Sequence, residues 1–150
     1  GSLAEKLAVL GAEVLMETLA AIRLGTLERK PQDSGRATYE PKLTRETGRI
    51  DWKANARTID CLVRGTDPWP GAFTLITGET MKVFGVKALE ETADAAPGTI
   101  VAADRKTGLI VACGDRNIEV TELQMPGQKR MSARDYLLGH KVEVGLLLGE

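Results

Sequence analysis

Residues 72–124 read AFTLITGETMKVFGVKALEETADAAPGTIVAADRKTGLIVACGDRNIEVTELQ. Short apolar or alternating runs in this stretch are separated by turn residues such as Thr77-Gly78-Glu79 and Gly114-Asp115, which is typical of antiparallel strands. Five strands are predicted, at 72–76, 81–89, 99–103, 108–113 and 117–124. Strands this short leave exposed edges unless the sheet closes, and about 60 residues suffice for a five-stranded OB-like barrel. We therefore expect a mainly β fold with flanking helices, built on a small OB-like β-barrel.

A turn and a helix precede the strands. Asp67-Pro68-Trp69-Pro70-Gly71 cannot continue a helix or a ladder, so it is predicted to be a rigid turn that plugs the indole of Trp69 against the next strand. Before it, apolar residues recur with helical spacing over 53–64. Asp51 is the expected N-cap of this helix, and Gly65 is its expected end.

A long amphipathic helix is predicted at the start of the chain, over residues 3–24, and Gly25 ends it. Its apolar stripe consists of Leu3, Leu7, Leu10, Val14, Leu15, Leu19 and Ile22. Leaving such side chains in water forfeits about 1.5–3 kcal/mol each, so the helix needs a partner surface. We expect it to dock on the barrel or on another copy of the chain. The preceding Gly1-Ser2 resembles the remnant of a purification tag.

Residues 28–53 have neither helical nor strand periodicity and contain Pro31 and Pro41, so they are predicted to form an extended basic linker. From residue 29 to residue 53, seven basic residues outnumber four acidic residues by three: Arg29, Lys30, Arg36, Lys42, Arg45, Arg49 and Lys53 against Asp33, Glu40, Glu46 and Asp51. A solvated connector and a nucleic-acid contact are both compatible with this pattern.

A second basic cluster follows the last strand. Lys129, Arg130, Arg134 and Lys141 against Asp135 give a local excess of three positive charges. Ser132-Ala133-Arg134-Asp135 is a variant of the capping box and predicts a short helix that ends near His140. The strands between the two clusters are net acidic. This separation suggests one positive face. The alternative is that these Lys and Arg side chains are exposed to solvent and bind nothing.

The sequence lacks the motifs that nucleophilic catalysis, phosphate binding and metal binding require. The formal net charge is −1, so polyanion binding must come from local clusters. Cys61 and Cys113 lack metal-site spacing and are expected to be reduced and buried, and the single His140 is expected to be structural. We find no nucleophile motif, no phosphate loop and no metal site, so no catalytic residue is predicted. No apolar run approaches about 20 residues, so a cytoplasmic protein without membrane contact is expected.

Several strings in the chain resemble methionyl-tRNA formyltransferase, in the order and spacing of that family. They are Pro41-Lys42-Leu43-Thr44, Gly48-Arg49-Ile50-Asp51-Trp52, Asp67-Pro68-Trp69-Pro70-Gly71-Ala72, Pro97-Gly98-Thr99-Ile100, Val111-Ala112-Cys113-Gly114-Asp115, Glu122-Leu123-Gln124 and Lys129-Arg130-Met131-Ser132-Ala133. The chain departs from the family at Asp67, where Asn is common, and at Val144, where Pro often precedes Gly.

The resemblance implies a domain organisation. Residues 1–2 would be the tag remnant, 3–25 the closing helix of an absent amino-terminal catalytic domain, 26–53 the interdomain linker, and 54–150 the carboxy-terminal OB-like domain. In the family, the catalytic domain binds the formyltetrahydrofolate donor. This chain is therefore expected to hold no cofactor and no metal, and to be inactive alone.

The resemblance also implies a partner, because the family's carboxy-terminal domain offers a positively charged surface to initiator methionyl-tRNA. The expected RNA-binding residues are Lys42, Arg45, Arg49, Lys129, Arg130 and Lys141. Lys42, Lys129 and Arg130 lie within family strings, and the others are chosen by charge and neighbourhood. Two alternatives remain open. The domain could belong to a related formyltransferase or formyltetrahydrofolate-using dehydrogenase or hydrolase, or it could be a structural or protein-binding barrel.

Overall fold

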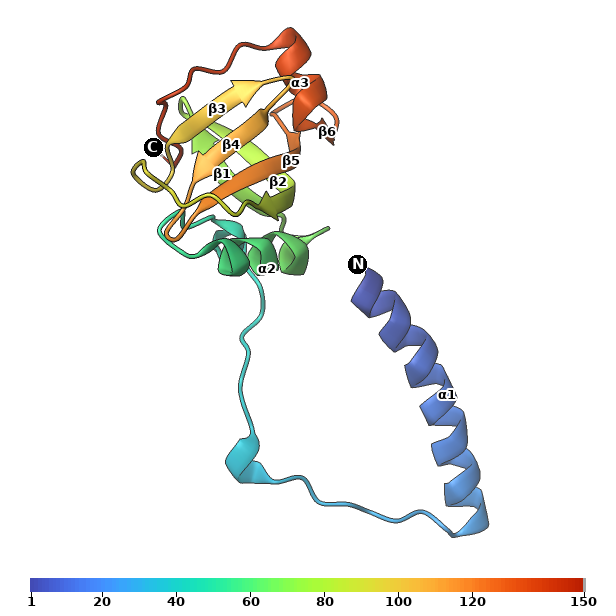
Figure 1. Cartoon of the computed structure of the whole chain (residues 1–150). Helices are drawn as coiled ribbons and strands as arrows, with labels where there is room; N and C mark the ends of the chain where they lie inside the picture. Colours follow the sequence, from blue (N-terminus) through green and yellow to red (C-terminus); the bar gives the residue numbers. More distant parts are fainter. Residues whose placement is uncertain (150) are drawn as a thin grey trace. The chain divides into compact units, whose positions relative to one another are not determined.

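A computed structural model describes residues 1–149 and divides the chain into two compact units, Gly1–Lys42 and Leu43–Glu150. The first unit contains helix α1 (Ser2–Leu24) and the 3-10 turn η1 (Ser34–Arg36) (Figure 1). Gly25 ends α1 in the left-handed conformation, with φ 69°, and its N–H bonds to the carbonyl of Ile22. Glycine is favoured there because it has no Cβ. The predicted helix and its end are confirmed.

The apolar stripe of α1 is exposed along its whole length. No residue of α1 is buried in the described chain, and Leu7, Leu10 and Val14 are each at least half exposed. The stripe is therefore free to pack against a partner, as its periodicity requires. Docking on the barrel or on another copy stays a prediction.

The second unit holds a mainly antiparallel six-stranded sheet with short helices at its ends. Its elements are η2 (Glu46–Gly48), α2 (Ala56–Thr66), β1 (Ala72–Ile76), β2 (Glu79–Ala88), β3 (Ile100–Asp104), β4 (Gly108–Ala112), β5 (Asn117–Gln124), β6 (Met131–Ser132) and α3 (Ala133–Gly139). The five predicted strands are confirmed with shifts of one or two residues at their ends. The short strand β6 is not among the five predicted strands.

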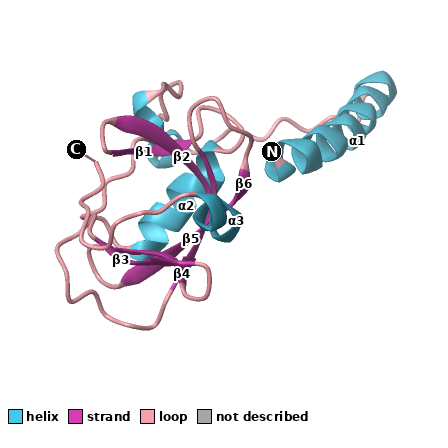
Figure 2. Cartoon of the chain, turned by 90° about the horizontal axis from the view of Figure 1, so that it is seen from above, coloured by secondary structure: helices cyan, strands magenta, loops and turns pink. Residues whose placement is uncertain are grey.

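The strand order is β1-β2-β5-β4-β3, and β6 pairs with β5. The sheet curls so that β1 and β2 face β3 and β4 (Figure 2). It is an open sheet, because β1 and β3 do not pair with each other among the described residues. The closed barrel that we predicted is therefore not found.

The last residues of the chain bridge the two edges of this open sheet. Leu148 N–H donates to the carbonyl of Gly98, just before β3, at 2.9 Å, and Gly149 N–H donates to the carbonyl of Leu75 in β1 at 2.9 Å. The backbone N–H and C=O groups at the edge of a sheet must be paired or covered. Here an irregular segment forms hydrogen bonds at both edges, where a closed barrel would pair its first and last strands. We call residues 145–149 the C-terminal strap.

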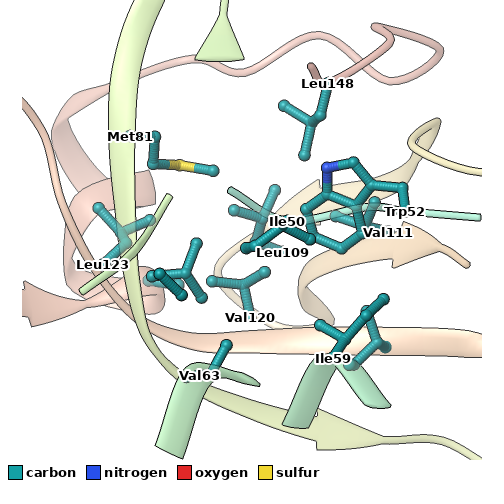
Figure 3. Close-up of a cluster of buried hydrophobic side chains, with 14 of the residues drawn as sticks. Ile50, Trp52, Ile59, Val63, Met81, Leu109, Val111, Val120, Leu123 and Leu148 are labelled. Carbon is teal, nitrogen blue, oxygen red and sulfur yellow. The ribbon is translucent and has the colours of Figure 1, made fainter. Parts of the chain in front are cut away.

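The core lies inside the curled sheet (Figure 3). Alternate residues of the strands point inward, as in the β1–β2 pair, where Ala72 is opposite Val83, and the β4–β5 pair, where Leu109 is opposite Val120. Helix α2 packs on β2 through Ile59 and Val63, while α3 lies at the opposite end of the sheet. Trp52 is buried in the same core, and its indole N–H donates to the hydroxyl of Thr74 at 3.0 Å.

The second helix departs from its predicted limits. Asn55, not Asp51, is the N-cap of α2, because its side chain accepts the N–H of Thr58 at 2.8 Å. Asp51 instead accepts the N–H of Lys53 in a turn that precedes the helix. Gly65 lies inside the helix, which continues to Thr66. The predicted capping box of α3 is confirmed, since Ser132 accepts the N–H of Asp135 at 3.1 Å.

Two predictions of burial were wrong. Trp69 does not plug the sheet, because 58% of its surface is exposed, and the other tryptophan, Trp52, fills the core. Cys61 is exposed on the outer side of α2, whereas Cys113 is buried as predicted. In both cases the pattern identified an apolar residue but not the side of the backbone on which it lies. Among residues 1–149, no helix is long and apolar enough to cross a membrane.

Candidate nucleic-acid interface

A hollow of about 540 Å³ lies on the outer face of β1 and β2, next to the exposed Trp69. Two cationic side chains, Arg45 and Lys82, contribute to it from distant parts of the sequence. Its lining residues are Arg45, Glu46, Trp69, Pro70, Gly71, Phe73, Thr80 and Lys82. The hollow therefore combines an aromatic face with a local excess of positive charge.

A second hollow, of about 320 Å³, continues from the first along β2. It shares Thr80 and Lys82 with the first hollow and extends to Gln124, Met125, Pro126 and Gly127. We call the residues that line the two hollows the β2 groove. The loop that carries Lys129 follows Gly127 directly, and Lys129 is exposed. The β2 groove thus connects Arg45 of the first basic cluster with the beginning of the second.

The strand alternation explains why Thr80 and Lys82 face the groove. Met81 and Val83 are fully buried, so their neighbours on β2 project from the opposite face of the sheet. Lys82 is paired in register with Phe73 on β1. Lys82 is not part of a basic cluster in the sequence, so it was not among the predicted RNA-binding residues, although the alternation of apolar and polar residues in β2 indicates that it lies on the outer face.

The position of Arg45 depends on how the η2 segment is attached to β1. Ile50 N–H donates to the carbonyl of Phe73 at 2.9 Å, and Arg49 forms a parallel bridge with the same residue. A Cβ at Gly48 would overlap the carbonyl of Gly71, so only glycine allows this close approach. These contacts fix the end of the predicted linker to the sheet and hold Arg45 beside the Trp69 turn.

Arg130 makes contacts within the domain that sequence analysis did not foresee. Its guanidinium lies 2.6 Å from a carboxylate oxygen of Glu122 and 3.2 Å from one of Asp67, and it stacks over Phe84 at 4.3 Å. The hydrogen bond with Glu122 raises the pKa of Arg130, and the same bond lowers the pKa of Glu122. Arg130 therefore ties the Asp67-Pro68-Trp69-Pro70 turn to β5, and its charge is offset locally.

This arrangement predicts a pH dependence of stability. Because the pKa of Glu122 is lowered in the folded state, its ion pair stabilises the fold above the unfolded pKa and is lost as pH falls through the folded pKa. Glu122→Gln should cost less than about 1 kcal/mol at pH 7, since the pair is partly exposed. The difference from wild type, measured by urea unfolding, should disappear at low pH. Glu90→Gln, in an exposed loop, is the control, and a pH-independent difference would contradict the account.

Two other candidate residues of the second unit, Arg49 and Lys141, lie away from the β2 groove. Arg49 lines a hollow beside the C-terminal strap, where its guanidinium is 3.5 Å from the carbonyl of Gly149. Lys141 lines another, near Tyr136 and Glu143. Lys42 is the last residue of the first unit and is described apart from the second. Within the second unit, the structure thus brings Arg45 and the start of the loop of Lys129 to the β2 groove, but not Arg49 or Lys141.

Three other titratable groups make contacts within the fold, outside the β2 groove. The backbone N–H of Ala56 donates to Asp115 at 2.8 Å, and this bond lowers the pKa of that carboxyl. Burial raises the pKa of the Cys113 thiol. His140 stacks on Tyr136 at the end of α3, with ring centroids 4.2 Å apart. Within residues 1–149, no three His, Cys, Asp or Glu side chains gather where they could hold a metal ion.

Comparison with known proteins defines the class of this domain. The family model described as "Formyl transferase, C-terminal domain" matches residues 42–141, which include the whole β2 groove. In fold, the chain is similar to HypX from Aquifex aeolicus, crystallised in complex with tetrahydrofolic acid, with a TM-score of 0.60 at 20% identity. That likeness covers 89% of this chain and 26% of HypX, and it concerns the fold alone.

Curated relatives narrow the class to one enzyme family. The chain is 47% identical to the methionyl-tRNA formyltransferase of Acetivibrio thermocellus over 100% of this chain and 48% of that protein. It is 45% identical to that of Geobacter metallireducens over 99% of this chain and 47% of that protein. The chain belongs to the methionyl-tRNA formyltransferase family, of which it contains the carboxy-terminal domain. It spans about half the length of these relatives.

Proposed function

We propose that this chain binds initiator methionyl-tRNA through the β2 groove and orients it for formylation in translation initiation. The observation that carries the proposal is the position of Arg45, Lys82 and the Lys129 loop along one continuous surface. Lysine and arginine on such a surface can contact successive phosphates without reading bases. The names of the relatives support tRNA as the polyanion.

The candidate residues have different weights in this proposal. Arg45 and Lys82 would supply charges in the groove, and Lys129 would add one from the loop that follows it. Arg49 and Lys141 would extend the contact beyond the groove, and Lys42 would contribute from the first unit. Arg130 is already paired with two carboxylates, so its main contribution would be to hold the Trp69 turn and the loop of Lys129 in place. A buried or offset charge attracts a phosphate less than a free one.

We extend the proposal to the organisation of the parent protein. Residues 3–25 would close the catalytic domain, and the apolar face of α1 supports this because it is exposed here. Residues 26–53 would link the domains, and 54–150 would form an OB-like domain in which the C-terminal strap completes the sheet. The formyltetrahydrofolate donor would bind in the part of the relatives that this chain does not match. Such a role would place the protein in the cytoplasm.

The proposal is tested by the salt dependence of tRNA binding. Arg45→Ala combined with Lys129→Ala removes two phosphate contacts, so the slope of log affinity against log salt should fall by about one to two units. The matched control is Arg57→Ala with Lys87→Ala, which removes two exposed charges that line a different hollow. Fluorescence anisotropy with labelled initiator tRNA at several salt concentrations gives both slopes. Equal slopes in wild type and in the groove variant would remove the tRNA role from this surface.

A further inference from the structure

Trp69 is an exposed aromatic side chain that lies outside the core of the domain. Of its surface, 58% is open to solvent, although tryptophan is costly to leave in water. The core is filled by Trp52 instead. Within residues 1–149, no side-chain hydrogen bond involves the indole N–H of Trp69, whereas the indole N–H of Trp52 donates to the hydroxyl of Thr74. The exposed indole lines a hollow together with two cationic side chains and is therefore open to a ligand.

The surroundings of Trp69 indicate the chemistry of that ligand. Arg45 and Lys82 line the same hollow, and Thr80 adds a hydroxyl beside them. Among the described residues, Glu46 is the one acidic side chain in the lining, against two cations, so this part of the hollow has a net positive charge. Pro70 is part of the lining and Pro68 precedes Trp69, so prolines on both sides limit the backbone freedom of the turn. The ligand must therefore offer a flat apolar face together with negative charge.

We infer that the Trp69 hollow binds an unpaired nucleotide of an RNA strand. The base would stack on the indole, and the flanking phosphates would pair with Arg45 and Lys82. Single-strand-binding proteins use this combination of aromatic platforms and a positive groove that follows the backbone. The volume of about 540 Å³ is within the range of small-molecule sites and leaves room for one nucleotide. That the RNA is a tRNA rests on the proposed function.

The geometry favours a nucleotide over an acidic peptide or a paired RNA segment. An acidic peptide would satisfy the two cations but would leave the indole face without a partner. A duplex presents its phosphates but keeps its bases stacked on each other, so it could not cover Trp69. The site should therefore discriminate between single-stranded and double-stranded RNA.

The experiment measures binding of a six-nucleotide oligoadenylate to the whole chain, by tryptophan fluorescence and by competition. Stacking should quench the emission of Trp69 in the wild type. Trp69→Ala and Trp69→Leu should weaken binding by about tenfold or more, whereas Trp69→Phe, which keeps an aromatic face, should retain most of it. In Trp69→Phe the quenching should vanish, because the remaining Trp52 is buried. A six-base-pair RNA duplex and hexaglutamate should cause no quenching.

Deacylated initiator tRNA, titrated in parallel, separates this inference from the proposed function. Loss of Trp69 should lower tRNA affinity without changing the salt slope, whereas loss of Arg45 and Lys129 should change the slope. If tRNA binds with the expected slope but neither RNA quenches Trp69, the stacking site is refuted and the tRNA role stands. If oligoadenylate quenches Trp69 but tRNA does not bind, the stacking site stands without that role. Equal binding of oligoadenylate by wild type and Trp69→Leu would overturn the inference.

Discussion

Replacing Trp52 by Ala is expected to lower the free energy of unfolding of the second unit by about 3–5 kcal/mol. Trp52 is almost completely buried, and its ring contributes to the core inside the curled sheet (Figure 3). Its removal leaves a large cavity and also leaves the hydroxyl of Thr74 without the indole donor. A loss of this size is a large part of the stability of an ordinary domain.

Urea unfolding followed by circular dichroism measures this effect, and the second tryptophan provides the matched control. Trp69→Ala removes the same side chain from an exposed position, so its effect should stay within about 0.5 kcal/mol. The loss of unfolding free energy in Thr74→Val should lie between those of Trp52→Ala and Trp69→Ala, at about 1–3 kcal/mol, because this variant leaves the buried indole N–H of Trp52 unpaired. Similar losses for Trp52→Ala and Trp69→Ala would contradict the assignment of the core.

A single methyl group at Gly114 is expected to have an effect of nearly the same size, about 3 kcal/mol of lost stability. A Cβ there would overlap the backbone carbonyl of Lys53 and press on that of Ala54. The two segments are joined by the N–H of Gly114, which donates to the carbonyl of Ala54 at 2.9 Å. The clash involves backbone on both sides, so no flexible side chain can move away to relieve it.

Gly65→Ala is the control for Gly114→Ala and should change stability in the opposite direction. Gly65 lies within α2, and a Cβ there would meet nothing within 4 Å. Alanine is favoured over glycine in a helix by about 0.5–1 kcal/mol, so this variant should be more stable than wild type. Thermal unfolding of the two variants gives the comparison. Equal melting temperatures would show that the Lys53–Ala54 segment does not pack against Gly114 as described.

Much of the fold could be predicted from the sequence because its signals are local. The strand runs between glycine-containing turns gave strands within two residues of those observed, and Ser132-Ala133-Arg134-Asp135 correctly marked the start of α3. The limits of α2 failed because two side chains, Asp51 and Asn55, are both capable of capping. Only the tertiary placement of the segment decides that Asn55 caps and Asp51 closes a turn.

Features that depend on long-range contacts could not be predicted. The edge strands β1 and β3 do not pair with each other, and the C-terminal strap bonds to both edges instead. A segment without strand periodicity gives no sign of such pairing. The contact of Arg130 with Asp67 joins residues 63 positions apart, so a basic residue that looked free in the sequence is paired in the fold. Trp69 was misassigned because a proline-flanked tryptophan can face either the core or the solvent.

The central claim, that RNA binds along the β2 groove, is tested most directly by mapping amide chemical shifts in a proton–nitrogen NMR spectrum as initiator tRNA is added. We expect the changes to gather on Arg45, Trp69, Thr80, Lys82 and the loop that contains Lys129. The amides of Arg57, Lys87 and Arg116, which line a different hollow, should stay in place. Shifts confined to that second set, or an unchanged spectrum at saturating tRNA, would contradict the claim.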